Sequence, residues 1–297
     1  MANTVLRNLA AKSKLARFAV RYAENLDNRY LRAAIAATDG PAFYKRRLWK
    51  RYLTPDPAFQ PAPLTPEFRG YLEQLREEGI VNIAGHFEPV AARLRSLIDE
   101  MALTGYRRQD DVTDWLVDVG FVVPEVMRML TDPQLCGLFC NYYGRQAYYR
   151  EHPCISGMSA GAPGVDRSSS HVHCDGYRQL TLHLLLNDVS ATDTHLIYYA
   201  GTHKDSKLNY ERVTGTSKLV EGARTVLGTG RAGTLAVFDS GSGYHRGDYR
   251  PGQRYLLQCV VTSGWLPFKD RIREDADALR GVSGTLPAHV RAMFERR

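Results

Sequence analysis

Two histidines and one aspartate are the residues of this sequence whose types and spacing best suit chemistry. His173 and Asp175 are separated by one residue, and His245 follows much later in the chain. In an extended segment, residues i and i+2 point to the same side, so His173 and Asp175 can reach one ion while Cys174 points away. Two histidines and a carboxylate hold a metal by one face and leave neighbouring coordination positions open, as in non-haem Fe(II) sites that activate oxygen.

An arginine beyond the second histidine extends this pattern. Arg254 follows His245 by nine residues and begins a run of strand-forming residues. Its planar guanidinium suits a carboxylate, which it can bind through two hydrogen bonds. A buried charge without a partner is costly, so an inward-pointing Arg254 predicts a bound carboxylate. Fe(II), a dicarboxylate and oxygen together indicate oxidation that depends on 2-oxoglutarate as co-substrate.

The segments that must position these residues read as short strands. The β-type runs alternate with Gly, Asp and Ser turns, and they cover residues 179–189, 195–200, 224–227, 234–239 and 255–262. Helical patterns come earlier, at 66–76, 89–101 and 122–143 (broken at Asp132-Pro133), and a short strand is predicted at 80–83. This order predicts a mainly β fold with helical additions, an antiparallel sandwich or jelly roll backed by helices.

Two polar residues of the first long strand are candidates for co-substrate contact. Thr181 and His183 alternate with Leu182 and Leu184, so the polar pair shares one face of the strand. They are predicted to face inward and contact the co-substrate. The alternative is that both are core polar groups satisfied by hydrogen bonds within the protein.

Composition narrows the class of protein. The chain has 297 residues, of which 44% are hydrophobic and 24% charged, as in an ordinary soluble globular protein. Its five cysteines are an odd number without a Cys-x-x-Cys pair, which fits a reducing compartment better than a disulfide framework. No stretch approaches the roughly 20 apolar residues that a membrane span needs, and no signal-peptide pattern is visible. We therefore expect a cytoplasmic protein.

Positive charge is concentrated in the N-terminal segment. Residues 1–60 hold twelve Lys or Arg and four acidic residues, a net charge of +8, against +7 for the whole chain. A helical pattern over 5–37 and a basic cluster at 45–51 precede a series of prolines between positions 55 and 66. We place the domain boundary at these prolines, with a basic amphipathic helical extension at 1–60 and the domain that carries the chemistry at 61–297.

The basic segment has several possible roles. One is a helical extension that packs on the β domain and exposes a solvated basic face. Another is to bind an anionic membrane surface through residues 1–50, which would place the protein peripherally on the inner membrane face. One serine and two acidic residues within the first thirty argue against a transit peptide. Nucleic acid is the least favoured partner because no recognised motif accompanies the charge.

The chain resembles the phytanoyl-CoA dioxygenase-like family of Fe(II)/2-oxoglutarate-dependent oxygenases over residues 67–265. The segments that carry the resemblance are 77–87, His173-x-Asp175-Gly176, 186–189, 200–204 and 233–254. The sequence departs from the family pattern at Ala200, where the family often has proline, and in a shorter spacing from His245 to Arg254.

The resemblance implies a double-stranded β-helix, a cupin-like jelly roll. It implies that His173, Asp175 and His245 bind Fe(II) and that Arg254 anchors the far carboxylate of 2-oxoglutarate, helped by Thr181 or His183. The co-substrate would be cleaved to succinate and carbon dioxide as the substrate is oxidised. Related halogenases keep the Asp175 position small, so a carboxylate there favours hydroxylation or desaturation.

Three functional hypotheses follow. The first is a dioxygenase that hydroxylates an unidentified small-molecule or lipid-linked substrate, for which an anionic compound is a candidate. The second is a hydroxylase that works at a membrane surface on a lipid-linked sugar, such as Kdo in lipopolysaccharide, and it depends on the basic segment. The third is a non-catalytic jelly-roll module that binds a metal or ligand without turnover. Residues 101–121 and 201–224 are the predicted substrate-lining loops.

Overall fold

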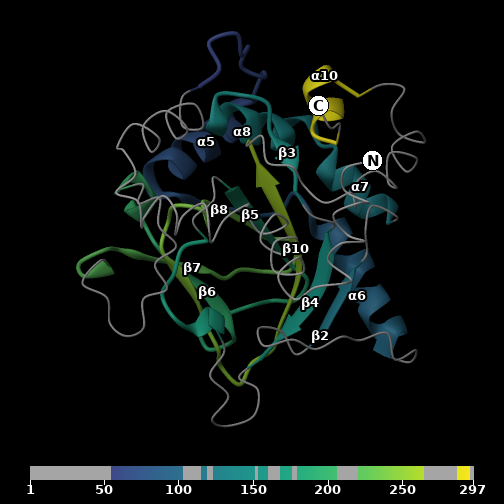
Figure 1. Cartoon of the computed structure of the whole chain (residues 1–297). Coiled ribbons are helices and arrows are strands. Elements are labelled where there is room, and N and C mark those ends of the chain that lie inside the picture. The colour runs from purple at the N-terminus through teal and green to yellow at the C-terminus, as the bar shows by residue number, and fades with distance from the viewer. Residues whose placement is uncertain are drawn as a thin grey trace, which may run out of the picture. The chain divides into compact units, whose positions relative to one another are not determined.

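Strand β10 lies at the centre of a large antiparallel sheet in the computed structural model (Figure 1). Among the described residues this sheet has seven strands in the order β1-β8-β5-β10-β4-β2, with β3 paired to the far end of β10. Their bounds are β1 Ile80–Ile83, β2 Trp115–Asp118, β3 Tyr148–Tyr149, β4 Cys154–Met158, β5 Gln179–Leu185, β8 Leu235–Phe238 and β10 Arg254–Thr262.

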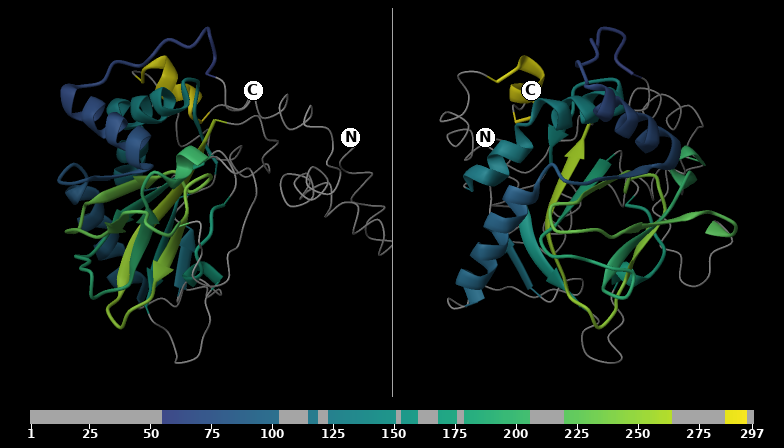
Figure 2. Two further views of the ribbon diagram at one scale, coloured as in Figure 1. Left: turned by 90° about the vertical axis from the view of Figure 1, so that its left-hand side faces the viewer. Right: turned by 180° about the vertical axis from the view of Figure 1, so that it is seen from behind.

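A second, smaller sheet faces the first. In the part of the chain that is described it has three antiparallel strands in the order β7-β6-β9, which are Thr225–Gly228, His195–Tyr199 and His245–Asp248. Leu196 and Tyr198 of β6 pack against Ile80 and Phe238 of the large sheet. These apolar contacts between facing strands make the two sheets a sandwich (Figure 2).

The structure describes residues 55–102, 115–118, 123–150, 153–159, 168–175, 179–205, 220–263 and 286–294. These residues belong to one unit, Pro55–Gly264 with Lys269–Arg297. The basic extension predicted at 1–60 falls almost entirely outside the described residues, as do much of the predicted loops 101–121 and 201–224. The division of the chain at residue 60 therefore stays a prediction.

Alternation along β5 separates the two faces of the large sheet. Leu180, Leu182 and Leu184 belong to the main hydrophobic core, on the side that the helices cover. Thr181 and His183 pair with Phe238 and Ala236 of β8, and directly paired residues of antiparallel strands point to the same face. Because Phe238 packs against the small sheet, this polar face of β5 is turned toward the interior of the sandwich; we call it the inner face.

Helices cover the outer face of the large sheet. They are α5 Pro66–Glu78, α6 Glu88–Ala102, α7 Pro124–Leu130, α8 Pro133–Tyr143 and α10 Ala288–Ala292. Apolar residues from all five, including Leu75, Leu94, Leu130, Phe139 and Val290, pack in one core with the sheet. In Figures 1 and 2, α6 lies on the side of the large sheet away from β6 and β7. No described helix is long and apolar enough to cross a membrane.

Local sequence signals explain where α5 begins and ends. The Thr65 hydroxyl accepts a hydrogen bond from the backbone N–H of Phe68, which satisfies one free donor of the first turn. Gly79 ends the helix with φ 82°, a left-handed conformation that glycine adopts without strain. A Cβ at Gly79 would also collide with the Tyr198 hydroxyl and the His203 ring. The tight turn therefore lets β1 start where its first residue, Ile80, packs against Tyr198 of β6.

Most predicted elements are confirmed, and the differences are local. The fold class is confirmed: a mainly β sandwich backed by helices. The strand predicted at 179–189 ends at Leu185, because Val189 forms an isolated bridge with Gly230 instead. Five elements were not predicted from the sequence: β2, β3, β4, β9 and α10.

Candidate metal centre

Backbone pairing brings the two distant histidines together. His173 and His245 form an isolated antiparallel bridge, with N···O distances of 3.0 and 2.8 Å for its two hydrogen bonds. The N–H of Asp175 donates to the carbonyl of Ser240 at 2.7 Å. One ligand atom from each of His173, Asp175 and His245 lies within 4.8 Å of the others. The structure therefore groups the three predicted metal ligands, while Cys174 packs in a separate apolar cluster.

A hydrogen bond at Nδ1 holds each histidine ring and leaves Nε2 to bind a metal. Nδ1 of His173 lies 2.7 Å from the carbonyl of His171, and Nδ1 of His245 lies 3.0 Å from the carbonyl of Gly243. A carbonyl can only accept, so each Nδ1 carries the proton and each Nε2 keeps its lone pair. Nε2 of His173 is 3.9 Å from Oδ1 of Asp175. Two free lone pairs and a carboxylate oxygen thus converge.

Burial keeps His245 neutral. Loss of hydration lowers the pKa of His245 to about 4, with a further contribution from His173, while the Asp175 carboxylate acts in the opposite direction. At neutral pH the imidazole is unprotonated, which is the form that binds a metal. With His173 and Asp175, the donor set is two imidazoles and one carboxyl group, the chemistry of a facial Fe(II) site.

Arg254 is a buried charge with few hydrogen-bond partners among the described residues. It is 3% exposed, and its Nε and Nη1 have no acceptor among the described residues. Among the described residues, Nη2 donates to the Met158 sulfur at 2.9 Å, a weak acceptor. Burial lowers the pKa of Arg254 to about 10, so it remains a cation at neutral pH. A buried cation with this few partners calls for a bound anion.

Thr181 and His183 both lie on the inner face, but their surroundings differ. The Thr181 hydroxyl is 2.8 Å from that of Ser240. His183 is buried with Nδ1 unpaired among the described residues, and its ring packs against Phe238. Burial, with a smaller contribution from the Arg254 guanidinium, lowers the pKa of His183 well below its usual value. The Phe238 ring also packs against His245, so His183 lies close to the group formed by His173, Asp175 and His245.

Three residues that were not predicted from the sequence also belong to the inner face. Gln179 starts β5 in the same alternation as Thr181, a signal that could have identified it. Ser156 is fully buried on β4, with its hydroxyl unpaired in the described structure, and it is paired with Leu256, two residues from Arg254. Ser240 follows β8 and had no distinctive sequence signal.

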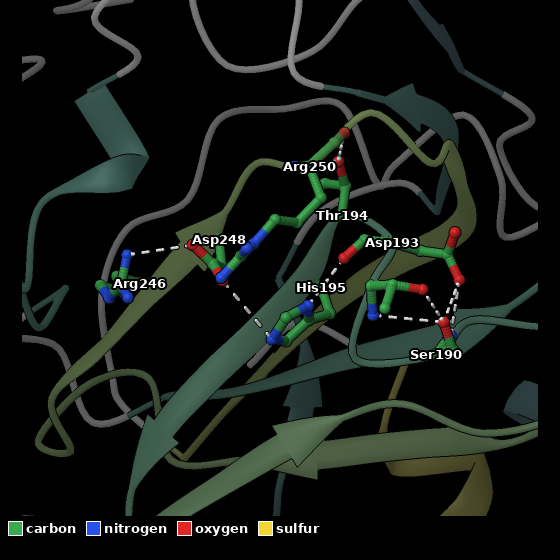
Figure 3. A network of polar contacts seen from close by, with 8 residues as sticks. Ser190, Asp193, Thr194, His195, Arg246, Asp248 and Arg250 are labelled. Atoms are coloured by element: carbon green, nitrogen blue, oxygen red, sulfur yellow. Dashed lines mark hydrogen bonds and ion pairs between the residues drawn. The ribbon is translucent and has the colours of Figure 1, made fainter.

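A second polar network lies on the face of β9 that points away from His245 (Figure 3). The carboxylate of Asp248 binds both Arg246 and Arg250, at 3.4 and 2.9 Å, and lies 3.8 Å from Nε2 of His195. Arg246 and Arg250 therefore share one aspartate on this side of β9. Nε2 of His203 lies 3.0 Å from the carbonyl oxygen of Arg76.

Comparisons with known proteins agree on the fold. No protein-family model matches the sequence, and no curated protein is significantly similar to it. EctD from S. alaskensis, solved with 2-oxoglutarate and 5-hydroxyectoine, is 16% identical; 71% of this chain and 80% of EctD are covered, with a TM-score of 0.51. The epimerase SnoN, solved with Fe3+, alpha ketoglutarate and nogalamycin RO, is 16% identical; 66% and 83% are covered, with a TM-score of 0.50. The helix-backed jelly roll is therefore a fold that this chain shares with iron- and 2-oxoglutarate-binding enzymes.

Proposed function

We propose that this chain is an Fe(II)/2-oxoglutarate-dependent oxygenase of the phytanoyl-CoA dioxygenase-like kind, and that it hydroxylates its substrate. One observation carries the proposal: the group formed by His173, Asp175 and His245 lies at the same inner face as the buried, under-paired Arg254, and Phe238 of that face packs against both His183 and His245. A metal alone would not require the arginine. A dicarboxylate that bridges a metal and a guanidinium accounts for both features.

The residues fit this co-substrate by their chemistry. His173, Asp175 and His245 would hold Fe(II), and Arg254 would bind the far carboxylate of 2-oxoglutarate. Bound Fe(II) and 2-oxoglutarate supply the oxidising power for attack on a C–H bond. Thr181 and His183 are proposed as further co-substrate contacts; for His183 the unpaired Nδ1 supports this role. Burial of Arg254 would strengthen its hold on the carboxylate, because water does not compete there.

Hydroxylation is the reaction that the ligand set favours. Asp175 occupies the position that must be small when a halide binds the metal, so halogenation is disfavoured. The fold itself does not select the outcome, since SnoN is an epimerase and EctD was solved with 5-hydroxyectoine. The choice between hydroxylation and desaturation therefore depends on how the substrate is held.

Anaerobic addition of Fe(II) and 2-oxoglutarate to the metal-free protein tests the proposal. A weak visible charge-transfer band is expected only when both are present. Under oxygen, the same mixture should release succinate slowly even without substrate. A well-folded protein without the band would favour the remaining alternative, a jelly-roll module that binds ligands without turnover, whereas a band without succinate would indicate a site that binds but does not react.

We further propose that the substrate is a small or lipid-linked anion, and that residues 1–50 bring the protein to an anionic membrane surface. The +8 charge of residues 1–60 supports this, at about 1 kcal/mol for each cation near the lipid. The protein should co-sediment with vesicles that contain anionic lipid and be released by high salt. Replacing the five cations of residues 45–51 by glutamine should weaken the binding. Binding that is unchanged by this replacement would assign the membrane contact to another surface.

A further inference from the structure

Gln179 contacts the carboxylate of the metal-ligand group directly. Its Nε2 donates to Oδ2 of Asp175 at 2.7 Å and to the hydroxyl of Ser240 at 2.9 Å. Its Oε1 accepts from Nη1 of Arg150 at 2.5 Å. Gln179 is 5% exposed, so these hydrogen bonds are sheltered from water. A buried amide with three side-chain partners has little freedom to turn.

The chemistry of the partners fixes which way the amide points. The guanidinium of Arg150 can only donate, so it must face the amide oxygen. An ionised carboxylate can only accept, so Asp175 must face the amide nitrogen. Exchanging the two ends of the amide would break both hydrogen bonds. The orientation of Gln179 is therefore set by its neighbours and does not depend on where hydrogens are placed.

Ser240 ties the backbone and the side chain of Asp175 to the same support. Its carbonyl accepts from the N–H of Asp175 at 2.7 Å, and its hydroxyl binds Gln179 and Thr181. Ser240 is 1% exposed and follows β8, while Gln179 and Thr181 belong to the adjacent strand β5. Two rigid strands thus hold the aspartate from one side.

We propose that Gln179 is a positioning residue that turns one oxygen of Asp175 toward the metal and retains the other. This inference rests on the proposed function. Oδ2 is held by Gln179, while Oδ1 is the oxygen that lies 3.9 Å from Nε2 of His173. A carboxylate that binds through one oxygen leaves three neighbouring positions for a chelating co-substrate and oxygen. A carboxylate free to bind through both oxygens would occupy one of them.

Titration of the metal-free protein with Co(II) tests the role of Gln179 without relying on turnover. Gln179→Met keeps the side-chain length and removes the amide. It should bind Co(II) roughly 10–100-fold more weakly than the wild type, the usual effect of losing a residue that orients a ligand. The visible d–d spectrum of the bound Co(II) should change as well, because the carboxylate can adopt another ligation mode.

Gln146→Met is the matched control. Gln146 also donates two hydrogen bonds from Nε2, to the carbonyls of Ala147 and His289, but it lies on the helix side of the sheet. This variant should keep the Co(II) affinity and spectrum of the wild type, whatever its effect on thermal unfolding. Should Gln179→Met fail to fold, Ser240→Ala replaces it, since this change removes one hydrogen-bond partner of Gln179 and keeps the carbonyl that binds Asp175.

The outcomes separate this inference from the proposed function. If Co(II) binds the wild type and is lost in Asp175→Ala, the metal site stands. If folded Gln179→Met then binds Co(II) with wild-type affinity, the positioning role alone is overturned. A lower affinity with an unchanged d–d spectrum would overturn it as well. If Ser240→Ala is used instead, the same two results would overturn the positioning role. If Co(II) binding does not depend on Asp175 at all, the proposed function fails first.

Discussion

The Asp175→Ala variant should remain folded and bind Fe(II) more than about 100-fold more weakly than the wild type, the upper range for losing a residue that merely supports a ligand. The substitution removes the carboxylate donor of the group and leaves only the two histidines. The backbone N–H of residue 175 can still donate to Ser240, so the local fold is retained. Anaerobic Fe(II) titration in the presence of 2-oxoglutarate should show no charge-transfer band, and succinate release should fall to the level of metal-free protein.

Asp188→Ala is a suitable control for this variant. The Asp188 carboxylate also accepts a hydrogen bond, in this case from the backbone N–H of Ala232 at 2.8 Å, but Asp188 is exposed and lies in the loop that follows β5. The control should keep both the band and succinate release. A band of normal strength in Asp175→Ala would mean that Asp175 is not a ligand, and the group formed with His173 and His245 would have to be reassigned.

The clustering of His173, Asp175 and His245 could be predicted because two of the residues are local in sequence and the third needs only one backbone bridge. The His173-x-Asp175 spacing needs only an extended backbone to place both side chains on one side. His245 follows a strand and a glycine-rich turn, and a single backbone bridge to His173 is enough to complete the group. The inward direction of Arg254 was predicted from its place at the start of a strand. In the structure Arg254 is buried.

The supporting residues could not be predicted from the sequence, because their roles arise from tertiary pairing. Ser156 lies in Cys154–Met158, a run without clear alternation that becomes a strand by pairing with β10, about a hundred residues later. Ser240 reads as an ordinary turn residue until the pairing of β5 with β8 places it beside Gln179. Arg246 and Arg250 read as loop charges because their shared partner, Asp248, is recognisable only once β9 is formed.

The Arg254→Met variant should have opposite effects on stability and on ligand binding. Without ligand, its free energy of unfolding should equal or exceed that of the wild type by about 1–4 kcal/mol, as when buried charges are replaced by apolar side chains of similar volume. The reason is that the guanidinium is buried with two nitrogens unpaired in the described structure. With 2-oxoglutarate, the variant should lose about 2–5 kcal/mol of binding free energy, which corresponds to a dissociation constant at least about 30-fold higher.

Thermal unfolding with and without 2-oxoglutarate, in the presence of a redox-inert divalent metal, measures both effects at once. The wild type should gain about 2.7 kcal/mol at a ligand concentration 100 times its dissociation constant, and the variant should gain less than about 0.9 kcal/mol at that concentration. Pyruvate is the matched ligand, since it has the same keto acid end and no far carboxylate; its weak binding should be the same in both proteins. Arg254→Lys keeps the charge without the planar fork and should fall between them. If Arg254→Met instead unfolds readily without ligand, the guanidinium serves the fold, and the anchor for the far carboxylate must be sought elsewhere on the inner face.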